Sequence, residues 1–356
     1  MEKKTHILMT GGGTLGPVTP LFGIVSEWQK VEEGVKVSWI GTPSGPEKSL
    51  VEDKGIAFYP LLAPKLDRHK WWAWVTIGPL MVASCIRAFV LLKSIKPDIV
   101  FTAGGYVSVP VVWMAKLLRI PSWVHQLDVK PGIANRLMAP FAQRVSVTWE
   151  GSAKAFPARK TIVVGGLVRD GIAKGDRNRL MHLLDLDPAK PTVLVIGGGT
   201  GASTVNLAME AIADDLLATM NVIHVTGKGK MIDLLKEKGR GYAAIEFLST
   251  EMNDAYAAAD VVVARAGMGT ITELAELGKP SVILPIPDSH QLENAHALED
   301  RGAAEIIWKM NPQILKQVIV NLINDHNRRN ELGKGIGGIY SLNAAEKIVS
   351  ESRSMV

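Results

Sequence analysis

The sequence predicts an α/β protein made of two Rossmann-like domains, each built on a parallel sheet with helices on both faces. Apolar runs of strand length recur along the 356-residue chain, and each is followed by a glycine-rich turn and a stretch of helical periodicity. The runs are apolar on both faces, which is typical of buried parallel strands. The pattern begins again after about residue 165, and the chain is long enough for two domains.

The expected strands follow one another from end to end. In the first half they are HILMTGGG (6–13), VKVSWIGT (35–42), DIVFTAGG (98–105) and PSWVHQ (121–126). In the second half they are TIVVGG (161–166), TVLVIGGG (192–199), NVIHVTG (221–227), DVVVARAG (260–267) and SVILPIP (281–287). We expect domains at residues 1–164 and 165–340, with a helix in 341–356 that packs back on the first domain. Ligands of such sheets bind beyond the carboxyl ends of the strands, so the expected site is a cleft between the domains.

Composition excludes some classes of protein and favours an anionic partner for one half. With 47% hydrophobic and 21% charged residues, the chain is neither disordered nor of low complexity. The lone Cys85 cannot form an internal disulfide, and no secretory leader precedes the first strand, so we expect a cytoplasmic location. Residues 1–160 carry 20 basic and 11 acidic side chains, against 20 and 24 in residues 161–356. No recognisable nucleic-acid-binding motif accompanies this excess of basic residues, so nucleic acid is not expected as a partner.

Residues 71–92 form an apolar segment whose only charge is Arg87. A membrane span needs about 20 apolar residues, and we expect Gly78-Pro79 to interrupt this helix. An interfacial element fits better, because indoles beside basic groups suit the lipid headgroup boundary. The residues expected there are Lys65, Arg68, Lys70, Trp71, Trp72 and Trp74. The alternative is that these tryptophans belong to the core or to a contact between the domains.

Three glycine-rich loops follow expected strands, at residues 11–16, 197–202 and 264–270. Glycines there let the backbone approach a phosphate, and the next helix presents its N-terminal amides. A dinucleotide site would also have an acid at the end of the second strand, which instead reads WIGT (39–42), so a dehydrogenase is disfavoured. Glu273 follows the third loop. Its alternative role is structural, because Thr270 and Glu273 have capping-box spacing.

Taken together, these motifs resemble glycosyltransferase family 28, whose members have the two-domain GT-B fold, and in particular its peptidoglycan-synthesis members. The resemblance covers nearly the whole chain. In the first half it rests on GGGTLGPVTP (11–20), GTPSGPEKSLVEDKGI (41–56), AGGYVSVP (103–110) and VHQLDVKPGIANRL (124–137). In the second half it rests on GGLVR (165–169), GGGTGASTVN (197–206), the run from Phe247 to Pro280 and PIPDSHQLENA (285–295).

The resemblance implies an inverting transfer of N-acetylglucosamine (GlcNAc) from UDP-GlcNAc to the 4-hydroxyl of the N-acetylmuramic acid (MurNAc) sugar of lipid I, forming lipid II. It implies neither a metal nor a cofactor. The implied partners are UDP-GlcNAc, lipid I, an anionic membrane surface and other proteins of cell-wall synthesis. The implied location is the cytoplasmic face of the bacterial cell membrane, where the enzyme would be peripheral.

By similarity, the second half holds the donor. Glu273 would accept hydrogen bonds from the ribose, the backbone around Leu248 would read the uracil, and Arg169 would place a positive charge near the nucleotide. Helix-terminal amides would face the diphosphate and stabilise the departing UDP. The remaining donor residues implied are Gly199, Thr200, Met268, Gly269, Thr270, Gln291 and Asn294.

By similarity, the first half holds the lipid diphosphate on Thr14, Leu15 and Gly16, with Tyr106, Ser108 and Asn135 beside them. The chain departs from the family at two places. Pro17 stands where the family usually has a histidine, a candidate base, and proline cannot accept a proton. The family's His-Glu-x-Asn reads His125-Gln126-Leu127-Asp128 here. We expect Asp128 to be the catalytic base, with His125 assisting it. The alternative for His125 is a structural role, because a lone histidine at the end of a strand is often only a hydrogen-bonding residue.

Two alternatives stay open at this point. The Pro17 substitution is compatible with a related GT-B enzyme that acts on another lipid acceptor. A non-catalytic, UDP-sugar-binding membrane protein would bind UDP-GlcNAc without turning it over.

Overall fold

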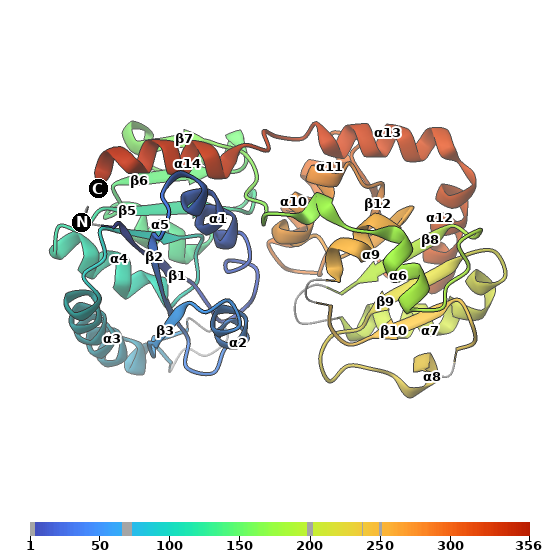
Figure 1. Ribbon diagram of the computed structural model, residues 1–356, viewed down its shortest axis with the longest axis horizontal. Coiled ribbons are helices and arrows are strands. Elements are labelled where there is room, and N and C mark those ends of the chain that lie inside the picture. Colours follow the sequence, from blue (N-terminus) through green and yellow to red (C-terminus); the bar gives the residue numbers. More distant parts are fainter. Residues whose placement is uncertain (1–3, 66–72, 198–201, 237, 249–250) are drawn as a thin grey trace. The chain divides into compact units, whose positions relative to one another are not determined.

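The computed structural model describes residues 4–65, 73–197, 202–236, 238–248 and 251–356, and for residues 73–76 it describes the backbone alone. The chain divides into two compact units (Figure 1): the first is Met1–Asp170 with Ser341–Val356, and the second is Gly171–Tyr340. The expected boundary lay between residues 164 and 165. The segment up to Asp170 stays with the first unit because it packs there: the carbonyl of Val168 lies against Gly23, and Gly166 N–H donates to the carbonyl of Ser341 over 3.1 Å.

The first unit is a seven-stranded parallel sheet in the order β3-β2-β1-β4-β5-β6-β7. Its central strands are apolar and fully buried, which is why they read as continuous hydrophobic runs. The strands are β1 (His6–Thr10), β2 (Lys36–Gly41), β3 (Ala57–Pro60), β4 (Ile99–Thr102), β5 (Ser122–Gln126), β6 (Arg144–Val147) and β7 (Thr161–Val163).

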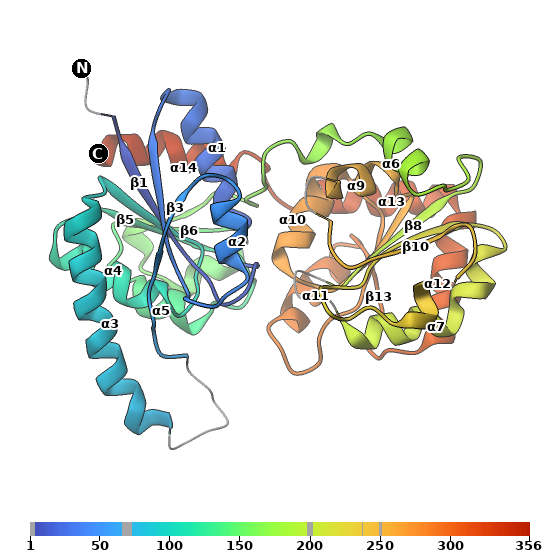
Figure 2. The same ribbon diagram turned by 60° about the horizontal axis from the view of Figure 1, so that its bottom comes forward.

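Helices connect these strands and cover the sheet. They are α1 (Leu21–Val31), α2 (Glu47–Glu52), α3 (Ala73–Ile95), α4 (Ser108–Leu117) and α5 (Ile133–Met138). Helices α3 and α4 pack side by side (Figure 2), over a core that includes Leu92, Val100 and Val111. The expectation that Gly78-Pro79 interrupts the helix is wrong, because α3 runs on through Pro79. The proline removes one N–H donor, and it does so in an exposed turn of the helix.

The C-terminal helix α14 (Ala344–Ser352) lies against α1 of the first unit (Figure 1). Ile348 and Val349 are buried, and Glu351 lies 3.7 Å from Arg144. Gly165 has a φ of +93°, and a side chain there would overlap the backbone of Ser341. The return of the chain to the first unit therefore depends on a glycine at this position.

The second unit is a six-stranded parallel sheet in the order β10-β9-β8-β11-β12-β13. Its strands are β8 (Thr192–Ile196), β9 (Asn221–Val225), β10 (Tyr242–Ile245), β11 (Val261–Ala264), β12 (Ser281–Ile283) and β13 (Glu305–Ile306). Its helices are α6 (Arg177–Leu183), α7 (Ser203–Leu217), α8 (Asp233–Lys236), α9 (Met252–Ala258), α10 (Met268–Leu277), α11 (Gln291–Glu299), α12 (Pro312–Asn324) and α13 (His326–Gly337). Helix α7 packs on α12 over an apolar core that includes Met209, Leu216, Ile319 and Leu322.

Within the described part of the chain, one helical segment is long and apolar enough to cross a membrane. It is Ile77–Ile95 of α3, and 22% of its most apolar window is buried. A single segment of this kind is weak support for a span, because core helices of soluble proteins pass the same test.

Candidate functional site

Each sheet has one point where the strand order reverses, and the glycine-rich loops lie there. In the first unit the reversal falls between β1 and β4, and in the second between β8 and β11. The loops after β1 and β4 touch, because a Cβ atom on Gly105 would lie 3.1 Å from the carbonyl oxygen of Gly12. Ligands of open parallel sheets bind at such reversals, beyond the carboxyl ends of the strands. Both units therefore carry a glycine-rich loop at the point of strand reversal, where the sequence predicts a binding site.

The loop after β1 presents backbone donors. Gly13 has a φ of +85°, a conformation that favours glycine. Within the described residues, no protein group accepts from the N–H of Thr14, Leu15 or Gly16. The carbonyl of Leu15 instead accepts from the N–H groups of Val18 and Thr19, which closes the turn. Such a loop suits an anion.

Three first-unit residues expected to bind the acceptor lie at different depths around this loop. Tyr106 is half-buried, and its ring lies against Gly13. Burial, and secondarily the charge of Glu47, raises the pKa of the Tyr106 phenol. Ser108 is fully buried, accepts from Thr10 Oγ1 over 3.3 Å and donates to the Gly104 carbonyl over 3.1 Å. Through these two hydrogen bonds, Ser108 joins the end of β1 to the loop after β4 and supports the loop after β1 from beneath.

Asn135 is also buried, with 4% of its surface exposed. Its Nδ2 donates to Gln126 Oε1 over 2.7 Å and to the His125 carbonyl over 3.1 Å. Gln126 in turn donates to the Asp128 carbonyl over 2.8 Å. This chain of amides fixes the loop that follows β5.

The two expected catalytic residues lie in contrasting surroundings. His125 is fully buried in β5, with Nδ1 2.9 Å from Ser146 Oγ and Nε2 3.2 Å from Thr148 Oγ1. Burial lowers its pKa to about 3, so the ring stays neutral. Asp128 is half-buried in the loop beyond the carboxyl end of β5, on the same edge of the sheet as the glycine loops. The geometry assigns His125 a structural role and leaves Asp128 as the candidate proton acceptor.

In the second unit, α10 begins directly after the loop that follows β11. Gly267 is the N-cap, and Met268, Gly269 and Thr270 form the first turn. The first N–H groups of a helix have no acceptor inside the helix. Among the described residues, no group accepts a hydrogen bond from the N–H of Gly269 or Thr270. These amides and the helix dipole make the start of α10 suited to a diphosphate.

The capping-box alternative for Glu273 does not hold. The helix begins before Thr270, so Thr270 lies inside the first turn and Glu273 in the second. The Glu273 carboxylate accepts a hydrogen bond from the hydroxyl of Tyr256, over 2.8 Å. Glu273 is half-buried, and the tyrosine holds its carboxylate in one orientation.

Arg265 is a functional candidate that was not predicted from the sequence, although it lies in the third glycine-rich loop. It follows β11, its Nη1 donates to the Leu284 carbonyl over 3.1 Å, and its Nη2 donates to Thr204 Oγ1 at the start of α7. Burial lowers its pKa, and no described group accepts from its buried Nε. An arginine between an apolar strand and a glycine loop was the signal that could have identified it. It places a cation where the strand order reverses.

Gln291 and Asn294 both lie on α11 but at different depths. Gln291 is half-buried, accepts from Ile286 N–H over 3.2 Å, and its Nε2 lies 3.9 Å from the position of a Cβ on Gly267. Asn294 is fully buried, and its Nδ2 donates to the Ala266 carbonyl over 3.0 Å. The structure therefore brings Gln291 to the start of α10, while Asn294 braces the loop before it.

The other expected donor residues are placed as follows. Leu248 is buried, just beyond the edge strand β10. Arg169 is half-buried near the end of the first unit. Gly199 and Thr200 lie outside the described residues.

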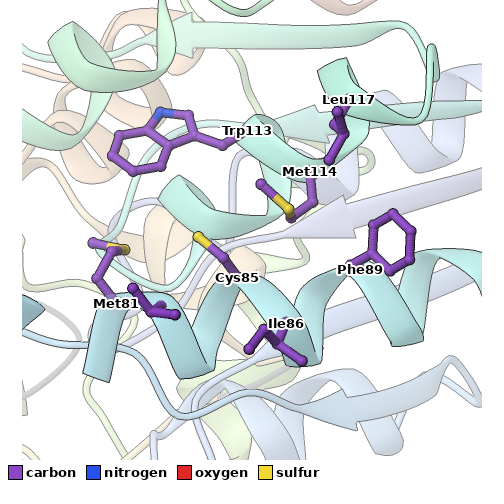
Figure 3. Close-up of a pocket in the computed structure, with 8 residues that line it drawn as sticks. Met81, Cys85, Ile86, Phe89, Trp113, Met114 and Leu117 are labelled. Carbon is purple, nitrogen blue, oxygen red and sulfur yellow. The ribbon is translucent and has the colours of Figure 1, made fainter. Parts of the chain in front are cut away.

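An apolar groove lies between α3 and α4 (Figure 3), and the sequence reasoning missed it. It has a volume of about 380 Å³. Val82, Ile86 and Leu117 are each more than 60% exposed. Neither helix contains an acidic residue, and Arg87, Lys93 and Lys116 lie on them. The lining residues are Met81, Val82, Cys85, Ile86, Phe89, Trp113, Met114 and Leu117.

Of the residues expected at a membrane surface, Lys65 is exposed. Arg68, Lys70, Trp71 and Trp72 lie outside the described residues, as does the side chain of Trp74. The groove is formed by the part of α3 that follows them in sequence.

Two Rossmann-like units with parallel sheets and glycine-rich loops at the points of strand reversal match the architecture of GT-B glycosyltransferases. Family models for the glycosyltransferase family 28 N-terminal and C-terminal domains match residues 7–147 and 192–348. The chain belongs to glycosyltransferase family 28.

Curated relatives and solved structures match over nearly the full length. A UDP-N-acetylglucosamine–N-acetylmuramyl-(pentapeptide) pyrophosphoryl-undecaprenol N-acetylglucosamine transferase of Bacillus cereus is 33% identical, over 92% of this chain and 93% of its own. The enzyme of that name from Legionella pneumophila is 34% identical, over 97% and 95%. The crystal structure of Acinetobacter baumannii MurG has a TM-score of 0.73 at 26% identity, over 98% and 99%.

Proposed function

We propose that this chain transfers GlcNAc from UDP-GlcNAc to the 4-hydroxyl of the MurNAc sugar of lipid I, which forms lipid II. The relatives that carry this activity in their names match both units. The observation that carries the proposal is the start of α10, where helix-terminal amides lie one turn before the Tyr256-oriented carboxylate of Glu273. That combination suits a nucleoside diphosphate, because the amides bind the diphosphate and the carboxylate accepts from the ribose hydroxyls.

The transfer inverts the anomeric centre in a single displacement. The acceptor oxygen forms a bond to the anomeric carbon, the bond from that carbon to the UDP oxygen breaks, and UDP leaves with the electron pair. The α10 amides stabilise the charge that gathers on the diphosphate, and Arg169 and Arg265 supply positive charge to the nucleotide. Gln291 donates to a hydroxyl of the donor sugar, and Asn294 holds the loop in place.

The acceptor proton passes to Asp128, which takes the role that Pro17 cannot fill. Asp128 lies beyond the carboxyl end of β5, two strands from β1, and its backbone is held by the Gln126 amide. The lipid diphosphate binds the amides of Thr14, Leu15 and Gly16, beside Tyr106. Asn135 and Ser108 support this loop cluster from beneath.

The groove between α3 and α4 attaches the first unit to an anionic membrane surface. Apolar side chains enter the lipid, and the basic residues on the two helices remain at the headgroups. Lys65, Arg68, Lys70, Trp71, Trp72 and Trp74 extend this attachment. The enzyme is then peripheral, on the membrane face where lipid I is made.

The test is transfer by the purified protein. It is incubated with labelled UDP-GlcNAc and a short-chain lipid I analogue, and both UDP release and the glycosylated product are measured. Transfer of GlcNAc to the analogue that continues when a chelator removes divalent metal ions supports the proposal. Binding of UDP-GlcNAc without transfer would contradict it. Because Pro17 departs from the family, other polyprenyl-diphosphate sugars are assayed in parallel, and preference for one of them would assign a different lipid acceptor.

A further inference from the structure

Glu47 is a buried carboxylate that the proposed function does not use. It is the first residue of α2, and none of its surface is exposed. Its Oε1 accepts from the Thr42 N–H over 2.7 Å and from the Thr42 hydroxyl, and its Oε2 accepts from the Gly13 N–H over 3.2 Å. A buried charge persists only when donors surround it, and here three of them do.

The surrounding glycines make room for this carboxylate. A Cβ atom on Gly12 or Gly45 would overlap its oxygens. Across the loop, a Cβ on Gly13 would lie 2.8 Å from Cε1 of Tyr106, so the tyrosine ring closes in on the same residue. Gly13 is therefore held between the Glu47 carboxylate and the Tyr106 ring, in a left-handed conformation with a φ of +85°. The loops after β1, β2 and β4 meet at this one residue.

The sign of the charge indicates what Glu47 does. A carboxylate close to an anion-binding loop repels the anion, so the charge itself works against phosphate binding. Its hydrogen bonds have the opposite effect and favour phosphate binding. By taking the Gly13 N–H, it fixes the peptide that precedes Thr14, Leu15 and Gly16, whose own N–H groups donate to no described protein group.

We propose that Glu47 is a positioning residue for the lipid-diphosphate acceptor, and that it acts by holding the Gly13 amide so that the next three amides face the diphosphate. The inference rests on the proposed function, since it takes this loop as the acceptor's binding site. Glu47 itself touches no reacting atom.

Glutamine cannot replace this carboxylate, although it has the same shape. One end of its amide must point an N–H group at either Gly13 or Thr42. The Thr42 hydroxyl can turn round and accept, but the backbone N–H groups of Gly13 and Thr42 cannot. One of these two N–H groups therefore loses its acceptor in Glu47→Gln, and the loop shifts.

The experiment compares Glu47→Gln with Glu52→Gln, a matched change at an exposed position on the same helix. Steady-state kinetics are measured with UDP-GlcNAc and the lipid I analogue, together with calorimetric binding of a short polyprenyl diphosphate. We expect Glu47→Gln to raise the acceptor KM and the polyprenyl-diphosphate Kd by roughly tenfold or more, with the donor KM within about twofold of wild type. Glu52→Gln should change none of these values.

A second pair of variants covers the case in which Glu47→Gln does not fold. Thr42→Val removes the hydroxyl that donates to Glu47 Oε1, and Thr42→Ser keeps it. We expect Thr42→Val to raise the acceptor KM by a smaller factor and Thr42→Ser to restore it. A merely structural role would lower the melting temperature without separating the acceptor KM from the donor KM.

The outcomes distinguish this inference from the proposed function. An unchanged acceptor KM in folded Glu47→Gln, or equal rises in both KM values, would overturn the positioning role. If wild type binds the polyprenyl diphosphate but transfers no sugar, the proposed function fails. In that case a Kd raised only in the Glu47 and Thr42→Val proteins still supports the positioning role, and an unchanged Kd overturns it.

Discussion

The hydroxyl of Tyr256 donates a hydrogen bond to Glu273 Oε2 over 2.8 Å, which joins α9 to α10 at the candidate donor site. Tyr256 is 1% exposed, so its ring cannot turn away without disturbing the core. One buried residue thereby fixes the orientation of the Glu273 carboxylate at the candidate donor site.

The first prediction concerns this hydrogen bond. Tyr256→Phe should raise the KM for UDP-GlcNAc about tenfold or more, since a hydrogen bond to a charged carboxylate contributes roughly 1.5–3 kcal/mol, and leave the acceptor KM unchanged. Steady-state kinetics check this. Tyr242→Phe is the control, because it also removes a buried tyrosine hydroxyl, one that lies 2.8 Å from His224 Nδ1 elsewhere in the second unit. A similar donor KM in the two variants would show that Tyr256 has no specific role in donor binding.

Much of the fold could be predicted from the sequence, because its central strands are buried on both faces. Runs such as TVLVIGGG (192–199) and DVVVARAG (260–267) contain β8 and β11, which lie next to each other in the second sheet. The strands that were missed are short: β3 (Ala57–Pro60), β6 (Arg144–Val147), β10 (Tyr242–Ile245) and β13 (Glu305–Ile306). Three of these, β3, β10 and β13, are edge strands, where partial exposure weakens the apolar pattern.

The candidate site was predicted less completely, because the spacing of residues along the chain does not show how deeply each side chain is buried. His125, Ser108 and Asn294 match motifs as well as Gln291 does, yet the first three are buried and bonded to the protein. Tyr256 and Glu47 could not be identified as partners of the site, because each reaches its loop from another element. The groove between α3 and α4 likewise requires the packing of two helices.

The second prediction separates a bracing role for Asn294 from direct contact with the donor sugar. Asn294→Ala removes the donor to the Ala266 carbonyl and leaves that buried acceptor unpaired, so we expect unfolding to become easier by about 1–3 kcal/mol. Denaturant unfolding measures this. Gln291→Ala, at a half-buried position, should cost less stability and raise the donor KM directly. If Asn294→Ala kept full stability and only the donor KM rose, Asn294 would contact the sugar.

The third prediction is a loss of stability in mild acid. Burial lowers the pKa of His125 to about 3 and of His224 to about 4, so both rings are neutral in the folded protein. In the unfolded chain each takes up a proton below about pH 6.5, so stability falls as the pH drops from 6.5 towards 4. Between pH 7 and pH 5, each buried neutral ring should lower the free energy of unfolding by about 2 kcal/mol.

Denaturant unfolding of wild type and His224→Gln between pH 7.5 and 5 isolates this contribution. The variant should be less stable at pH 7.5, because it loses bonds to Tyr242 and Asn206, but its stability should fall less steeply with pH. Equal slopes in the two proteins would show that His224 is not the group that takes up the proton.

The fourth prediction assigns the proton transfer. Asp128→Asn should lower kcat by roughly 10²–10⁴-fold and leave both KM values near those of wild type, because only the proton acceptor is lost. His125→Gln should instead lower the melting temperature, since it disturbs the contacts with Ser146 and Thr148, and retain most of the kcat. Normal turnover in Asp128→Asn together with an inactive, folded His125→Gln would reverse the assignment.

The fifth prediction concerns the groove between α3 and α4. Ile86 and Leu117 are 62% and 66% exposed, and burying a side chain of this size contributes roughly 1.5–3 kcal/mol. The double variant Ile86→Ser, Leu117→Ser should therefore bind anionic vesicles at least about tenfold more weakly in flotation, while transfer to a short-chain acceptor in detergent continues. Leu183→Ser with Leu207→Ser, exposed positions on the second unit, is the control. If the control pair weakened binding and the groove pair did not, attachment would belong to another surface, and the combined Trp71, Trp72 and Trp74 to Ser variant would test the segment before the groove.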